Sequence, residues 1–120
     1  GWGPLARLAA DGVEIGAHSA THPFLTALDN AEIVVEASRA RRELAVRLGV
    51  DPIAFAYPYG DVDDVVAHLV GAAGFELALT TEGRSTNLGD DPLRIPRLEV
   101  HSEVTAAGLL ELLDRVDAAA

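Results

Sequence analysis

Two histidines stand four residues apart in the stretch EIGAHSATHPFL, at His18 and His22. On one helical turn, two imidazoles with this spacing point the same way and can coordinate one divalent cation, with a carboxylate or water completing the shell. Such an ion polarises a substrate carbonyl and lowers the pKa of a water molecule that it holds. Two unliganded surface histidines would show the same spacing, so the pair alone leaves both a metal site and a polar surface open.

A second chemically suggestive stretch is YPYG, from Tyr57 to Gly60, which follows the apolar residues IAFA. A proline and a glycine so close together stop a strand and favour a tight turn. Taken alone, the stretch predicts a rigid connection between a strand and a helix, with packed tyrosines.

The composition limits the kinds of protein and partner to consider. A chain of 120 residues that is 49% hydrophobic is enough for a single domain, residues 1–120, with its own core. It has no cysteine, so any metal must be held by nitrogen and oxygen ligands. The net charge of -10 and the scattered arginines argue against a nucleic-acid partner. No stretch has the length and apolar character of a membrane span.

Hydrophobic periodicity predicts strands that alternate with helices. Period-two alternation predicts a short strand over 13–17, directly before His18. Asp29 and Glu32 have capping-box spacing and predict a helix that ends at Gly49. Further along the chain we expect, in order, a strand within 52–57, a helix over 61–74 starting at Asp61, a strand over 75–81, a polar loop over 82–92, an extended segment over 94–100 and a leucine-faced helix over 105–116.

This alternation predicts an α/β fold built from parallel βα units, either an open doubly wound sheet or part of a βα barrel. In both architectures functional groups gather beyond the carboxyl ends of the strands. We therefore expect four features on one rim of the sheet: His18, the turn of residues 57–60, the segment Thr80 to Glu82, and His101.

The wording and order of three stretches, DGVEIGAHSATHPFL, FAYPYG and RIPRLEV, resemble the polysaccharide deacetylase family, the NodB-homology domains of carbohydrate esterase family 4. The resemblance covers nearly the whole chain. It implies part of a distorted (β/α) barrel and an enzyme that removes acetyl groups from N-acetylated sugars with one bound divalent metal. The metal implied is zinc first, with cobalt or nickel as alternatives.

The resemblance also assigns roles to individual residues. The family motif His-(Ser/Thr)-x-x-His carries over to His18 and His22 as metal ligands, with Ser19 at the hydroxyl position. The motif of residues 57–60 implies a substrate groove formed by Tyr57, Pro58, Tyr59 and Gly60, in which the backbone amide of Tyr59 helps to hold the oxyanion. Backbone amides suit this role because they are fixed before the reaction begins.

Two further catalytic roles match the family pattern less closely. Many members have an arginine that orients the catalytic base where this chain has Ala56, and Arg97 could supply a guanidinium from a neighbouring strand or only pair with a surface carboxylate. His101 lies where the family often has a general acid, a role that suits an imidazole, although a rim histidine without a catalytic role is the alternative. His68 lies inside a predicted amphipathic helix, and we expect it to have no catalytic role.

The first motif of the family, (Ser/Thr)-Phe-Asp-Asp-Gly, is absent, and with it the catalytic base and the carboxylate metal ligand. We expect it upstream of Gly1, so that this chain is the later part of a deacetylase domain; the absence of any methionine agrees with that expectation. The implied partner is an acetylated glycan, and the family favours a secreted or cell-envelope location. Two alternatives remain open: a catalytically inactive relative that binds glycan or protein, and a hydrolase of another small amide.

Overall fold

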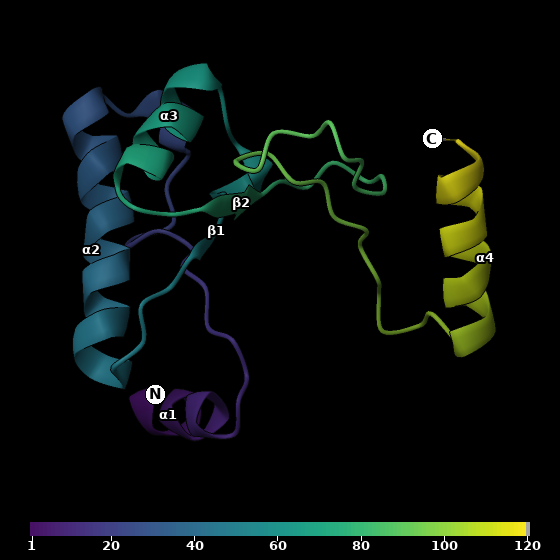
Figure 1. Ribbon diagram of the computed structural model, residues 1–120, viewed down its shortest axis with the longest axis horizontal. Helices are drawn as coiled ribbons and strands as arrows, with labels where there is room; N and C mark the ends of the chain where they lie inside the picture. Colours follow the sequence, from purple (N-terminus) through teal and green to yellow (C-terminus); the bar gives the residue numbers. More distant parts are fainter. Residues whose placement is uncertain (120) are drawn as a thin grey trace.

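The computed structural model describes residues 1–119 and contains the expected alternation of strands and helices (Figure 1). Two elements of the alternation were not expected: a helix at the start of the chain and a 3-10 turn after the histidine pair. In chain order the elements are α1 (Trp2–Ala10), η1 (Leu25–Ala27), α2 (Asn30–Leu48), β1 (Ala54–Ala56), η2 (Pro58–Gly60), α3 (Asp64–Ala72), β2 (Leu77–Leu79) and α4 (Ala106–Ala118).

The sheet is parallel, as the sequence predicts, but its strands are shorter than expected. β1 pairs with β2 in a register that sets Phe55 beside Ala78. The predicted strand over 13–17 and the predicted extended segment over 94–100 each contribute a single parallel bridge, Ala17 to Phe55 and Leu79 to Ile95. Gly16 and Pro96 flank these bridges, and neither residue type extends a ladder well. Four parallel segments therefore lie side by side in the order 17, 55, 78, 95.

α2 begins and ends where its capping signals predict. The Asp29 carboxylate accepts a hydrogen bond from the Glu32 amide, and the Glu32 carboxylate accepts one from the Asp29 amide, each at 2.9 Å. Gly49 closes the helix in the left-handed conformation, with φ of 66°. The face of α2 that includes Ile33 and Ala37 is buried, and the helix packs against α3.

α3 starts later than the sequence suggests. Its N-cap is Asp63, whose carboxylate accepts a hydrogen bond from the Val66 amide at 2.8 Å. Asp61, the first residue of the predicted helix, instead accepts hydrogen bonds from the amide and hydroxyl of Thr26. The long-range contact therefore moves the helix start by about one turn.

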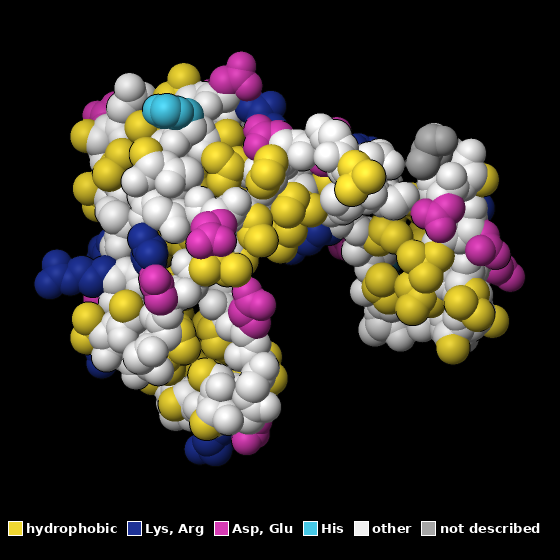
Figure 2. All heavy atoms as spheres, viewed as in Figure 1, with side chains coloured by type: hydrophobic (Ala, Val, Ile, Leu, Met, Phe, Trp, Pro, Cys, Tyr) yellow, Lys and Arg dark blue, Asp and Glu magenta, His cyan; other side chains and the backbone are white. Residues whose placement is uncertain are grey.

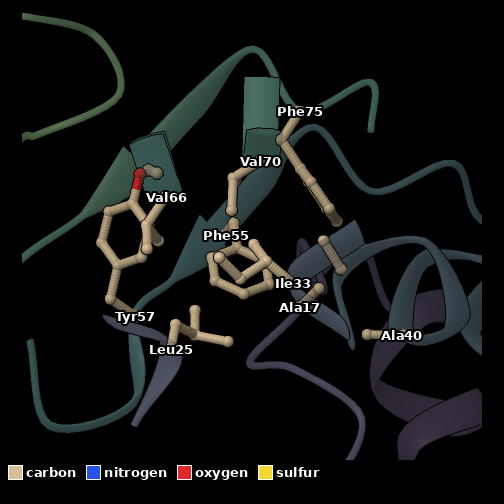
Figure 3. Close-up of a cluster of buried hydrophobic side chains, with 11 residues drawn as sticks. Ala17, Leu25, Ile33, Ala40, Phe55, Tyr57, Val66, Val70 and Phe75 are labelled. Carbon is tan, nitrogen blue, oxygen red and sulfur yellow. The ribbon is translucent and has the colours of Figure 1, made fainter. Parts of the chain in front are cut away.

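The core lies between the sheet, α2 and α3 (Figure 3). Phe55 is its centre, with its ring 5.5 Å from that of Tyr57 and 5.1 Å from that of Phe75. The buried side chains around it come from the two ends of the segment that carries the histidines, from β2, and from α2 and α3: Ala17, Leu25, Ile33, Ala37, Ala40, Val66, Val70 and Ala78. The segment that carries the histidines is thus anchored in the core at Ala17 and Leu25.

The two terminal helices contribute nothing to this core. α1 has no buried residue and lies against the end of α2, where the Arg47 guanidinium is 5.5 Å from the Trp2 ring centre. α4 also has no buried residue and stands apart from the sheet at the end of a long connection (Figure 1). Hydrophobic side chains of this helix face solvent (Figure 2); Leu110 is 64% exposed and Leu113 40%. Within residues 1–119, no helix combines the length and apolar character needed to cross a bilayer.

Candidate functional site

The parallel pairing brings the predicted site segments to one edge of the sheet. His18 follows the bridge at Ala17, the turn of residues 57–60 follows β1, and Thr80 follows β2. Arg97 comes two residues after the bridge at Ile95. These four segments therefore share the carboxyl-end rim, where the sequence predicted the first three together with His101. His101 lies further along the connection toward α4, where it is exposed and 3.9 Å from a Glu99 carboxylate oxygen.

The two histidine rings converge on this rim. Their Nε2 atoms are 3.0 Å apart, and both side chains are exposed. Nδ1 of His18 is 2.7 Å from the carbonyl oxygen of Ala56, so that nitrogen carries the proton and donates. Nε2 of His18 is then the nitrogen with a free lone pair, and it points at His22. A backbone carbonyl that fixes the tautomer in this way is typical of metal-binding histidines.

The convergence does not come from a helical turn, as the spacing alone suggested. Residues 18–24 form an irregular loop in which Ser19 and His22 have left-handed φ values of 62° and 63°. The Ser19 hydroxyl accepts a hydrogen bond from the His22 amide at 2.9 Å and so closes the loop on itself. Left-handed backbone at two non-glycine residues costs about 1 to 2 kcal/mol each, so the loop must be held by its surroundings.

Glu36, on α2, holds the middle of this loop. One of its carboxylate oxygens accepts hydrogen bonds from the amides of Ala20 and Thr21, at 2.9 and 2.8 Å, and the other accepts one from the Thr21 hydroxyl at 2.7 Å. Burial on its own raises the pKa of Glu36, but the three hydrogen bonds outweigh it and the pKa is lowered overall. The carboxylate is therefore ionised near neutral pH.

The turn after β1 is supported from beneath by Tyr57. Its side chain is fully buried, and its hydroxyl donates a hydrogen bond to the Leu93 carbonyl at 2.7 Å. Burial raises the pKa of this phenol well above its ordinary value. Pro58 is also fully buried. These two side chains therefore shape the turn from inside the core, and their part in a substrate groove stays a prediction.

Tyr59 is the exposed member of the turn. It has a left-handed φ of 60°, and its amide makes no hydrogen bond within residues 1–119. Its ring stacks on Phe24 at 4.0 Å and meets the His22 ring edge-on at 4.7 Å. Tyr59 and Phe24 are 56% and 54% exposed, so an aromatic surface adjoins the histidine pair.

Two contacts fix the position of the turn of residues 57–60. Gly60 has a φ of 68°, and a Cβ built on it would lie 2.1 Å from the Thr81 hydroxyl, so only glycine fits. The Asp61 carboxylate accepts hydrogen bonds from the amide and hydroxyl of Thr26, at 2.8 and 2.9 Å. The second contact ties the tyrosine turn directly to the loop that carries the histidines.

The remaining candidate residues lie away from the pair. Arg97 donates from Nε to the Thr80 carbonyl at 2.8 Å and borders a hollow of about 330 Å³ with Thr81, Leu98 and Glu99. Within residues 1–119 it makes no hydrogen bond or ion pair with either histidine. His68 is exposed on α3.

The donor set fits part of a metal site. Two neutral imidazoles whose Nε2 atoms lie 3.0 Å apart can share one divalent cation. Over the described part of the chain, however, no group of three or more histidine, cysteine or carboxylate side chains is placed to hold a metal ion. A further ligand would have to come from water or from outside these residues.

Sequence reasoning missed three residues that shape the site: Glu36, Phe24 and Asp61. Glu36 carried a usable signal, because it is a carboxylate on the same face of α2 as the buried Ile33 and Ala40. Asp61 was assigned to the start of α3, and nothing in the sequence pairs it with Thr26.

Comparison with known proteins adds an independent result. The polysaccharide deacetylase family model matches residues 2–78. Chitin deacetylase 1 of Cryptococcus neoformans var. grubii is 39% identical over 70 residues, which are 58% of this chain and 15% of that protein. The chain therefore spans only a small part of this relative.

Solved structures agree with the family model on the fold. The deacetylase PplD of Streptococcus pyogenes, solved with acetate, matches 93% of this chain and 50% of its own with a TM-score of 0.88 and 20% identity. A polysaccharide deacetylase of Bacillus cereus matches 93% of this chain and 36% of its own, with a TM-score of 0.84 and 23% identity. The α/β arrangement described above is thus part of the distorted (β/α) barrel of NodB-type deacetylases.

Proposed function

The chain belongs to the polysaccharide deacetylase family, and we propose that it is part of an enzyme that hydrolyses N-acetyl groups on a glycan with the help of a divalent metal ion. One observation carries the proposal. The Nε2 atoms of His18 and His22 converge to 3.0 Å on the carboxyl-end rim of the sheet, and the His22 ring meets the ring of Tyr59, a residue whose amide has no hydrogen-bond partner within residues 1–119.

His18 and His22 would supply two nitrogen ligands to the ion. Zinc suits this set best, and cobalt and nickel accept the same donors. When bound, the ion would supply Lewis-acid polarisation of the acetyl carbonyl and would make a water molecule more acidic. The carboxylate ligand and the catalytic base are proposed to lie in a part of the enzyme outside these 120 residues, because no described carboxylate completes the site.

The tyrosine turn would handle the substrate. The Tyr59 amide is fixed by the buried Tyr57 and Pro58 on one side and by Gly60 on the other, so it can donate to an oxyanion with little rearrangement. The exposed rings of Phe24 and Tyr59 offer an apolar surface against which the C–H face of a sugar ring can pack. An acetylated glycan is therefore the proposed substrate, in keeping with the chitin deacetylase similarity.

Two assignments remain proposals with weaker support. Arg97 would orient the base; it lies on the same rim, but its Nε already donates to Thr80. His101 would protonate the leaving amine, although its recorded partner is Glu99 and it lies beyond the rim. Both roles require the connection between Ile95 and α4 to approach the histidine pair more closely in the larger enzyme.

Acetate release from an acetylated chitooligosaccharide, with added zinc or cobalt, tests the proposal. The chain alone should be close to inactive, because it lacks the carboxylates that hold the ion and take the proton from water. A longer chain from the same gene that includes an upstream Asp-Asp motif should release acetate. In that longer chain H18A should abolish turnover, whereas H68A, a change at an exposed histidine on α3, should not.

A second candidate function is a non-catalytic module that binds glycan. Within the described residues, the metal site has two protein ligands and no third. A module that only binds glycan can function with this incomplete site, whereas a metal-dependent hydrolase cannot. The same assay distinguishes the two functions. Glycan binding that persists in H18A and with a chelator present, together with no acetate release by the longer chain, would favour the module.

A further inference from the structure

The histidine loop, residues 18–24, is held unevenly at its two metal-facing residues, His18 and His22. His18 has its own anchor, because Nδ1 donates to the Ala56 carbonyl next to β1. Within residues 1–119, His22 makes no hydrogen bond to the sheet. Its amide donates to Ser19 within the loop, and its ring contacts the rings of His18 and the exposed Tyr59. The position of His22 therefore depends on the loop itself.

That loop is not a conformation that its residues prefer. Ser19 and His22 both have left-handed φ, yet neither is glycine. Strained backbone persists only where the surrounding structure over-determines it. Between these two residues lie Ala20 and Thr21, and both of their amides donate to one carboxylate oxygen of Glu36.

The Glu36 contacts account for the strained shape. The carboxylate receives three hydrogen bonds from two consecutive residues, and hydrogen bonds to an ionised acceptor are the stronger class. Glu36 is itself fixed, because it lies on the side of α2 that packs on the core near Ile33 and Ala40. The rigid helix thus determines the course of the loop at the point where it turns back toward His18.

We propose that Glu36 is a positioning residue that holds residues 19–22 so that Nε2 of His22 converges with Nε2 of His18. The inference deepens the proposed function and rests on it for the identity of the ligand. Glu36 touches neither histidine and would act only through the loop. Its loss should therefore weaken metal binding without removing a metal ligand.

The test compares three substitutions at Glu36 with a control on the same helix. E36A removes all three hydrogen bonds, and E36D keeps the charge but withdraws the carboxylate by one methylene. E36Q keeps a carbonyl oxygen that can accept hydrogen bonds from both amides. Its NH₂ group can donate a hydrogen bond to the Thr21 hydroxyl oxygen. The control is E43A, because Glu43 lies on the same helix and its ion pair with Arg47, at 3.6 Å, is exposed.

Two sets of measurements should be made on each variant. The first is zinc affinity, from competition with a coloured chelator. The second uses metal-free protein: hydrogen exchange of the Ala20 and Thr21 amides, and the nuclear Overhauser contact between the His22 and Tyr59 rings. E36A and E36D should bind zinc at least about 10-fold more weakly than the parent, with faster exchange and a weaker ring contact. E36Q should recover most of the affinity, and E43A should match the parent.

Parental zinc affinity and parental amide exchange in both E36A and E36D would overturn the proposal. If E36A does not fold, E36D alone decides, since it keeps the charge and the helix. If neither the parent chain nor the longer chain with the Asp-Asp motif binds zinc, the metal part of the proposed function fails. The exchange and ring-contact measurements then still show whether Glu36 positions His22, so the two failures are distinguishable.

Discussion

Leu25 and Leu110 belong to two differently built regions of the chain. Leu25, in the loop after the histidine pair, is fully buried among core residues from the sheet, α2 and α3. Leu110, on α4, is 64% exposed, and that helix buries none of its residues. The first region is defined by contacts between residues far apart in sequence, whereas α4 is defined by local signals such as its Thr105 N-cap.

The difference shows where this chain concentrates its order. The histidine loop and the tyrosine turn are tied to each other by Thr26 and Asp61, and to α2 by Glu36. α4 approaches the loop around Ser85, whose hydroxyl donates to Asp117 at 3.3 Å. The candidate site should therefore depend on the core, and α4 should be separable from both.

The same substitution in the two regions should give the largest contrast. L25A should lower the free energy of unfolding by about 2 to 5 kcal/mol, because it leaves a cavity in the core. L110A should change it by no more than about 0.5 kcal/mol, since that side chain is largely in solvent. Urea unfolding followed by circular dichroism measures both. Equal losses would show that α4 packs against the core in solution.

A pair of glycine substitutions separates crowding from backbone strain. Gly60 and Gly49 have nearly the same left-handed φ, 68° and 66°, but only at Gly60 would a Cβ meet another atom, the Thr81 hydroxyl. G49A should cost about 1 to 2 kcal/mol for backbone strain alone. G60A should cost about 1 to 3 kcal/mol more, because the added methyl group is overpacked. Equal costs in urea unfolding would mean that Thr81 moves aside freely.

The loop next to α4 should give the smallest effect, visible only in acid. The Asp90 pKa is lowered to about 2, first by the Arg84 side chain, at 2.6 and 2.9 Å, and then by the Asn87 amide. A lowered pKa means that this contact contributes fully above the ordinary aspartate value and is lost as the pH falls through about 2.

A carbon-13 titration of the Asp90 carboxyl group checks this behaviour. R84Q should raise its pKa toward the ordinary value near about 3.9, whereas R115Q, at an arginine whose Nε donates to the Glu111 carbonyl on α4, should leave it unchanged. An Asp90 pKa that is the same in R84Q and in the parent would contradict the assigned cause.

The features that the sequence predicted well are those that depend on local chemistry. Asp29, Glu32 and Gly49 carry their capping roles in their residue types and spacing, and Pro58 with Gly60 forces the turn after β1. The shared rim followed from the alternation of strands and helices. The family motif singled out the two histidines whose rings converge, and they lie in an irregular loop rather than on a helical turn.

The features that it missed depend on contacts across the fold. The left-handed backbone at Ser19 and His22 is stabilised by Glu36, a distant residue on α2, and the late start of α3 follows from Asp61 bonding to Thr26. The lengths of the strands depend on the segments that pair with them in the sheet, and hydrophobic periodicity does not show which segments pair. No element was predicted over α1. None of its residues is buried, and the helix packs against the end of α2.

The most direct test of the account is a zinc titration of the chain followed by the ring resonances of its four histidines. His18 and His22 should shift together and saturate at one ion per chain, while His68 and His101 should stay unchanged, because only the first two converge on one point. H18A should remove the response of His22, and H22A that of His18. Separate saturation of His18 and His22, or equal shifts at all four histidines, would contradict a shared metal site.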